Sequence, residues 1–168
     1  SDPKQMGTLM RALETPTTNA SWRFWVRLAI GCLPTNKRIV KMATATEENI
    51  YKQVYADALG AEGRCNRCGC DQETLEHAIA ECPMAQPKWL RLHSRLEDDW
   101  AEAGLNWNKI DWLNPILYPE TDVQYARMGM VPKRAALMIP GSSIETYNLI
   151  AKTAQKILDT SYEIWADR

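Results

Sequence analysis

The sequence has no long apolar run. Its longest apolar stretches, near residues 29–33 and 135–140, fall far short of the roughly 18 residues that a membrane-spanning helix needs, so we expect no span. The strict alternation of apolar and polar residues that is typical of half-buried strands is also missing, as are internal repeats and low-complexity tracts. Apolar residues make up 45% of the 168 residues and charged residues 24%, which predicts a globular domain rather than a disordered chain.

The sequence also lacks an excess of positive charge. Its 20 basic and 21 acidic residues give a formal net charge of −1, which argues against a surface built throughout to bind phosphates. The charge is nevertheless uneven along the chain. Residues 1–41 hold seven basic and two acidic residues, a balance of +5, whereas residues 94–126 hold two basic and seven acidic residues, a balance of −5. A local basic surface is therefore compatible with the composition.

No catalytic motif stands out. The sequence has no phosphate-binding glycine loop, no recognisable Ser/His/Asp order and no metal motif with an open coordination position. The acidic triplet at 97–99 precedes Trp100 on a predicted helix, and such a charge run is most simply a solvated helix face. We therefore expect that the protein is not an enzyme.

Apolar residues recur at helical spacing along nearly the whole chain. We predict one mostly α-helical domain over residues 1–168, ending in a long helix at 142–167. The expected N-terminal caps are Thr35, Thr44 with Glu47, Thr74, and Ser142 with Glu145. The other predicted helices cover about 18–30, 36–42, 44–59, 74–81, 87–103 and 120–128, with an irregular segment at 106–119 that holds one helical turn at most.

The clearest signal is a group of cysteines that includes one of only two histidines. Cys65 and Cys68 have the two-residue gap that lets two thiolates of one turn bind a single tetrahedral Zn²⁺. His77 and Cys82 follow at a spacing that suits a helical histidine and a thiolate just beyond the last turn. The pattern C-x2-C-x8-H-x4-C (CCHC) is the ligand set of a closed structural site. We therefore predict one structural Zn²⁺ in a knuckle at residues 61–83 that links two helices.

Other interpretations of the five cysteines stay open at this point. A disulfide needs an oxidising compartment and leaves one cysteine unpaired, and a redox-active C-x-x-C normally accompanies a βαβ pattern. Cys70 could replace Cys68 as a ligand through the looser Cys65-x4-Cys70 loop. Cys32 suits a small core position, and His93 suits an ordinary surface or boundary position.

Two further blocks accompany the cysteine motif. Residues 65–83 contain Cys-x2-Cys-Gly, Glu-Thr-x-x-His and Glu-Cys-Pro, residues 27–36 read RLAIGCLPTN, and residues 162–168 read YEIWADR. Together these blocks resemble the zinc-binding region C-terminal to the reverse transcriptases of LINE-type non-LTR retrotransposons. Those regions read C-x2-C-G…E-T-x-x-H-x4-C-P, with an upstream R-x-x-x-G-x-L-P-T segment and an I-W-x-x-R ending on a terminal helix.

The resemblance implies a zinc-bearing accessory domain, severed from or encoded beyond the polymerase, that helps to bind template RNA or target DNA. It covers residues 22–93 well and the last eight residues weakly, while Cys70 and the acidic middle depart from the family pattern. The polymerase's catalytic Asp-Asp motif is absent from this sequence. The chain begins at Ser1 without an initiator Met, so we expect an excised piece of a retroelement protein, or of a gene derived from one, that is nuclear or cytoplasmic.

Basic residues near these motifs are the candidates for nucleic-acid contacts. Arg64 and Arg67 belong to the zinc turn, which should leave them at the surface where phosphates or unstacked bases could meet them. Trp22 and Trp25 could stack on bases, although their helical spacing favours the core. The remaining basic candidates are Arg23, Arg27, Lys37, Arg38 and Lys41.

A protein-interaction module is the alternative function. The acidic segment 94–126 and the seven Trp and six Tyr residues suit an interface with aromatic anchors. In this hypothesis the retroelement-derived domain keeps its structural zinc and binds a protein partner instead of RNA or DNA.

Overall fold

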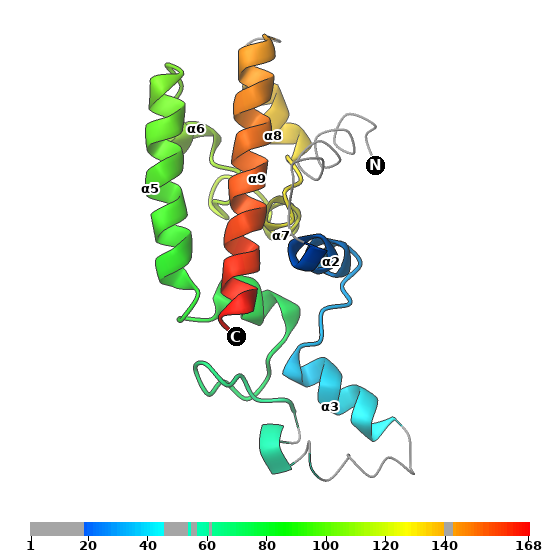
Figure 1. Ribbon diagram of the computed structural model, residues 1–168. Coiled ribbons are helices and arrows are strands. Elements are labelled where there is room, and N and C mark those ends of the chain that lie inside the picture. The colour runs from blue at the N-terminus through cyan, green and yellow to red at the C-terminus, as the bar shows by residue number, and fades with distance from the viewer. Residues whose placement is uncertain (1–18, 46–53, 55–56, 61, 140–142) are drawn as a thin grey trace.

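The computed structural model describes residues 19–45, 54, 57–60, 62–139 and 143–168 (Figure 1). The predicted helical class is confirmed, and these residues contain no β-strand. None of the helices found in this part of the chain is long and apolar enough to cross a membrane. In chain order the elements are α2 (Asn19–Ala29), α3 (Asn36–Thr44), the π-helix η1 (His77–Glu81), α5 (Gln86–Glu102), α6 (Trp107–Ile110), α7 (Glu120–Arg127), α8 (Lys133–Met138) and α9 (Ile144–Ala166).

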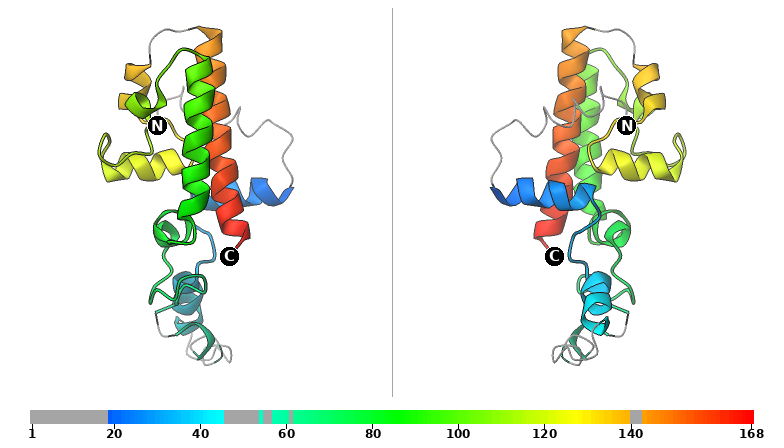
Figure 2. Two further views of the ribbon diagram at one scale, coloured as in Figure 1. Left: turned by 90° about the vertical axis from the view of Figure 1, so that its left-hand side faces the viewer. Right: turned by 90° about the vertical axis from the view of Figure 1, so that its right-hand side faces the viewer.

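Two long helices, α5 and α9, lie side by side in opposite directions and form the body of the domain (Figure 1). Leu92 and Leu96 of α5 and Ile157 and Leu158 of α9 are at most 1% exposed, so the apolar stripe of each helix packs into a shared core. The helices α2 and α7 lie across this pair and also contact α9 (Figure 2). The helix α3 and the turn that follows residue 62 extend beyond the end of the pair where α9 finishes.

Three tryptophans explain how the irregular segment 106–119 folds back onto the helical pair. Trp100, Trp107 and Trp112 are at most 1% exposed, and their ring centroids are 5.3–5.9 Å apart. Trp100 Nε1 also donates to Thr153 Oγ1 on α9 at 2.9 Å, which satisfies the buried indole N–H. The predicted single helical turn in this segment is confirmed as α6.

The predicted helix caps have mixed outcomes. Thr35 caps α3 as predicted, because its Oγ1 accepts from the backbone N–H of Arg38 at 3.3 Å. The predicted cap Ser142 lies outside the described residues, and Ser143 caps α9 by accepting from Thr146 N–H at 3.2 Å. Thr44 is the last residue of α3, and most of the predicted helix 44–59 is not among the described residues. The short helix α8 was not predicted.

Candidate metal centre

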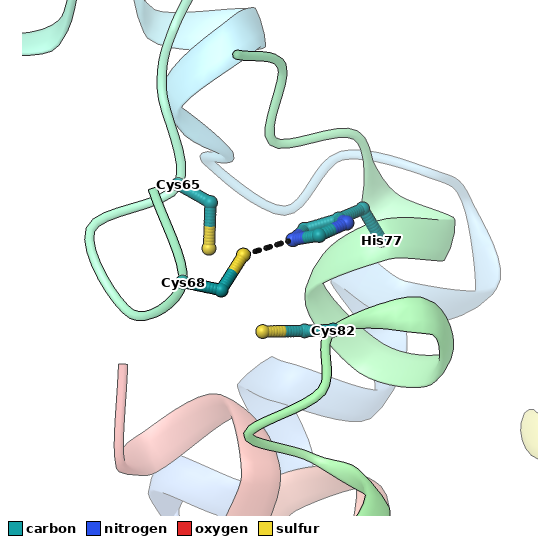
Figure 3. A group of neighbouring side chains, drawn as sticks. All are labelled: Cys65, Cys68, His77 and Cys82. Carbon is teal, nitrogen blue, oxygen red and sulfur yellow. Dashed lines mark hydrogen bonds between the residues drawn. The ribbon is translucent and has the colours of Figure 1, made fainter. Parts of the chain in front are cut away.

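Four side chains converge at the end of the domain where the long C-terminal helix finishes. The sulfurs of Cys65, Cys68 and Cys82 and a ring nitrogen of His77 all lie within 4.8 Å of one another (Figure 3). Cys68 is exposed and the other three residues are buried. The four residues predicted from spacing are therefore brought together.

The turn that carries the first two cysteines is built from short-range backbone hydrogen bonds. The backbone N–H of Gly69 donates to the carbonyl of Cys65, and the N–H of Cys65 donates to the carbonyl of Cys70, each at 2.8 Å. Gly69 has a φ of +77°, and glycine adopts this left-handed conformation without steric cost. The tight turn thus directs Cys65 and Cys68 to the same side.

The other two ligands are joined by one turn of π-helix. Thr74 Oγ1 accepts from the backbone N–H of His77 at 3.0 Å, which confirms its predicted capping role. The N–H of Cys82 then donates to the carbonyl of His77 at 2.9 Å, across five residues. This hydrogen bond holds the two ends of η1 close together, and such π-turns occur often at functional sites.

The electrostatics of the cluster favour a cation. Burial acts to raise the pKa of the Cys65 thiol, but the backbone groups of Cys68 and Arg67 outweigh it and the pKa is lowered. At Cys68 a backbone hydrogen bond from Cys70 acts to lower the pKa, but partial desolvation and the neighbouring thiols raise it to about 11. Several thiolates so close together are stable only when a positive charge lies between them.

The donor set fits a tetrahedral metal. Zn–S bonds of about 2.3 Å in a tetrahedron place sulfurs roughly 3.8 Å apart, a spacing within the 4.8 Å spread of the four ligand atoms. Cys68 Sγ and His77 Nε2 are 3.2 Å apart. Cys70 is not a member of the cluster, and its exposed sulfur instead contacts the carbonyl of Gln72 at 3.7 Å. The geometry therefore favours Cys68 over Cys70 as the ligand.

A buried carboxylate holds the cysteine turn against α3 and the end of α9. Glu73 is 0% exposed, and its Oε1 accepts from the backbone N–H of Asn36 at 2.9 Å and from Arg168 Nε at 2.7 Å. Asn36 in turn donates from Nδ2 to the carbonyl of Arg64 at 2.6 Å and accepts from Arg168 Nη2 at 2.8 Å. The network therefore joins the three sequence blocks at residues 27–36, 65–83 and 162–168, each of which contributes one residue.

Arg67, in the cysteine turn, does not lie where we expected it. We expected the turn to leave Arg67 at the surface, but its side chain is half-buried and donates to the carbonyl of Ile164 at 3.1 Å and to that of Ala78. The guanidinium therefore joins the cysteine turn to the last turn of α9 and to η1. Arg38 has a similar role, because its exposed guanidinium donates to the carbonyl of Gly31 at 3.0 Å, just beyond α2.

The other predicted contact residues have mixed outcomes. The side chains of Arg23, Arg27, Lys37, Lys41 and Arg64 are exposed, and Lys37 Nζ also donates to Gln72 Oε1 at 2.8 Å. Trp25 is 3% exposed, so its predicted core position is confirmed, whereas the side chain of Trp22 is outside the described part of the structure.

The remaining predictions concern Cys32, His93 and the acidic triplet. Cys32 is only half-buried, so its predicted core position is wrong, and His93 lies at the boundary as expected. In the triplet, Glu97 and Asp98 are exposed, while Asp99 pairs with Lys156 of α9.

Sequence reasoning missed the roles of Glu73, Asn36 and Arg168. All three lie in the sequence blocks described above, at residues 27–36, 65–83 and 162–168. The only signal for their roles was that these blocks contain an acidic residue, Glu73, and a basic residue, Arg168. Their burial could not be predicted, because it depends on contacts between residues 36, 73 and 168.

Comparisons with known proteins give no relative. No family model matches the chain, and neither a curated protein nor a solved structure matches it. The functional interpretation therefore rests on the residues and geometry described above.

Proposed function

We propose that Cys65, Cys68, His77 and Cys82 hold one structural Zn²⁺, and that the domain associates non-catalytically with nucleic acid as part of a retroelement-derived protein. The observation that carries the proposal is the convergence of three sulfurs and one imidazole nitrogen within 4.8 Å. The ion would neutralise the thiolates and cross-link the turn to η1. With four protein ligands no coordination position stays open, so the metal stabilises the fold and does not act on a substrate.

Exposed basic side chains around this centre support nucleic acid as the partner. Arg64 projects from the cysteine turn itself, and its backbone carbonyl is fixed by the side chain of Asn36 at 2.6 Å. Lys37 and Lys41 are exposed four residues apart on α3, so they share one helix face. Exposed cations on a rigid end of a domain are suited to phosphates, whose neutralisation releases counterions.

A reducing compartment is part of the proposal. Cysteine binds metal as the thiolate, and thiols persist in the nucleus and the cytoplasm, where disulfides are rare. All five cysteines of the chain are free in the structure.

Metal analysis combined with a salt titration tests the proposal. We expect one zinc per chain and an affinity for single-stranded RNA or duplex DNA that falls as salt rises. Replacing Arg64 by Ala should weaken binding to all sequences and reduce the salt slope by about one. Arg134→Ala on α8, also an exposed arginine, is the matched control and should leave both unchanged. One zinc with no binding at low salt would reject the nucleic-acid proposal and keep the metal site.

A group of exposed apolar side chains favours the alternative, a protein-interaction module. Ile116 is 91% exposed, and Leu137 and Met138 of α8 are 79% and 53% exposed. Tyr118 OH lies 3.5 Å from Met138 Sδ, which places the 115–118 turn beside α8. Exposed apolar surface of this kind is typical of interaction sites. A stoichiometric protein partner in nuclease-treated lysate that is lost on Leu137→Glu would support this function over the first.

A further inference from the structure

An open pocket lies where α2, η1 and α7 meet, next to the metal centre. Its empty volume, which includes open space at the mouth, is about 370 Å³. Leu28 of α2, Ile79 of η1 and Met128 after α7 provide apolar walls. A flat apolar group of modest size could be buried against them.

Three polar side chains also line the pocket. They are Glu76, which precedes η1, and Gln124 and Arg127, which lie three residues apart on α7 and so share one helix face. A carboxylate, a carboxamide and a guanidinium in one small apolar pocket form a selective set of hydrogen-bonding groups. Glu76 is exposed at the rim, so its hydrogen-bonding capacity is accessible to a ligand.

The guanidinium of Arg127 lines the pocket and forms one long ion pair. Its side chain is 22% exposed, and its ion-pair partner Glu120 is 3.8 Å away. Burial lowers the pKa of Arg127, although the charges of Glu120 and Glu81 act to raise it. A half-buried cation of this kind favours an anionic group in the ligand.

We propose that this pocket binds one unpaired nucleobase with an exocyclic amino group, and that Arg127 contacts its adjoining phosphate. The proposal rests on the nucleic-acid function proposed above and adds a preference for unpaired bases. Apolar walls suit the faces of an unstacked base, and a carboxylate accepts hydrogen bonds from an amino group such as N4 of cytosine. Uracil and thymine have no such group, so Glu76 discriminates against them.

The pocket depends on the metal centre through η1. Ile79 and Ala80 line the pocket, and the ligands His77 and Cys82 bracket them in the chain. Loss of the metal would release both ends of this segment and remove one wall. We therefore expect base preference to require the loaded metal centre.

Binding of short homopolymers to the full metal-loaded chain tests the pocket. Oligo(C) and oligo(U), each as RNA and as the DNA equivalent, are compared by fluorescence anisotropy at one salt concentration. We expect oligo(C) to bind about tenfold more tightly than its uracil or thymine counterpart, from one base-edge contact. Glu76→Gln should bring the ratio close to one by raising oligo(U) affinity, because the amide can donate to O4 of uracil as well as accept from N4 of cytosine. Glu102→Gln, an exposed glutamate at the end of α5, is the matched control and should keep the ratio.

The outcomes separate this inference from the proposed function. If no oligomer binds at low salt, nucleic-acid association itself fails. If all oligomers bind equally, or if Glu76→Gln keeps the preference, the pocket assignment is wrong and nucleic-acid association stands. Gln124→Ala provides an independent check, because it should lower oligo(C) affinity more than oligo(U) affinity. Metal content and Tm of each variant show that a changed ratio does not come from a lost fold.

Discussion

Arg168 lies against the buried carboxylate of Glu73, with Nη2 at 2.6 Å and Nε at 2.7 Å from the same oxygen. The guanidinium also stacks on the ring of Trp165, 4.5 Å from its centroid. Glu73 precedes the proposed metal ligand His77 by four residues, so the pair joins the C-terminal end of α9 to the segment that carries the Cys/His cluster. Because Glu73 is fully buried, Arg168 compensates for the cost of removing its carboxylate from water.

Arg168→Ala tests the pair directly. We expect it to lower the free energy of unfolding by about 3 kcal/mol, because it leaves a buried carboxylate without its cation. Urea denaturation measures the loss. In a Glu73→Gln background the same substitution should cost much less, and equal costs in the two backgrounds would show that the two side chains are not coupled.

Gly63 and Gly69, in the cysteine turn, distinguish two costs of adding a Cβ. One is a clash with a neighbouring backbone, and the other is strain from a positive φ. A Cβ on Gly63 would lie 2.3 Å from the backbone nitrogen of Lys37, whereas a Cβ on Gly69 would meet nothing within 4 Å. Both residues have positive φ. We expect Gly69→Ala to cost about 1 kcal/mol from strain alone, and Gly63→Ala to cost at least about 3 kcal/mol. Thermal unfolding measures both, and similar losses would contradict the close approach of α3.

Arg67 and Arg64 should differ in what they contribute to stability. Arg67→Met keeps the apolar part of the side chain but removes the hydrogen bonds to Ile164 and Ala78, so we expect a loss of about 2 kcal/mol. Arg64→Met changes an exposed side chain and should stay within about 0.5 kcal/mol of the wild type. Chemical denaturation of the two variants distinguishes these roles, and the opposite order would reverse the assignment.

Metal content shows whether Cys68 or Cys70 is a ligand. Cys68→Ser should lose stoichiometric zinc, and Cys70→Ser should retain it, because only Cys68 belongs to the cluster. His77→Ala should also lose zinc and loosen residues 62–82, seen as faster amide exchange there than in α5 and α9. Full zinc in Cys68→Ser would assign the ligand to Cys70 instead.

Asp111 gives the protein a pH dependence with a defined sign. Burial raises the pKa of Asp111, although the charge of His93 acts to lower it. The fold thus favours the protonated carboxyl, and stability is lost as pH rises through the raised pKa. Asp111→Asn keeps the acceptor for the N–H of Leu113, which lies 2.9 Å from Oδ1. Its Tm should exceed that of the wild type by a few degrees at pH 7, with a gain that disappears below about pH 4.

Asp98→Asn, at an exposed position of α5, is the control for this titration. A lower Tm for Asp111→Asn at pH 7 would instead show that the attraction to His93, 3.5 Å away, outweighs the cost of burial.

Local signals in the sequence were sufficient for most of the described helices and for the grouping of the four Cys and His residues. Thr35 and Thr74 are caps because each hydroxyl accepts from a backbone N–H three residues further along the chain. Such a local interaction can be predicted from the sequence alone. The four ligands were found for the same reason, since a turn and one helical segment hold them all. The cap at Ser142 was assigned one residue early, because Ser143 has the same chemistry.

Long-range contacts were not predictable from spacing. Arg67 was expected at the surface because a tight metal-binding turn cannot easily bury a long basic side chain. Its acceptor at Ile164 lies 97 residues away in the chain. The short helix α8 was missed because Lys133–Met138 has too few turns to show a periodic pattern.

The network around Glu73 also has a consequence for the order of folding. Asn36 and Arg168 are bonded across a sequence separation of 132 residues, so nearly the whole chain must be closed into a loop before this contact forms. The turn and η1 can form early because their contacts are local, whereas their attachment to α9 is a late step. During synthesis, the cysteine turn would emerge and meet its metal well before Arg168 is available to complete the buried network.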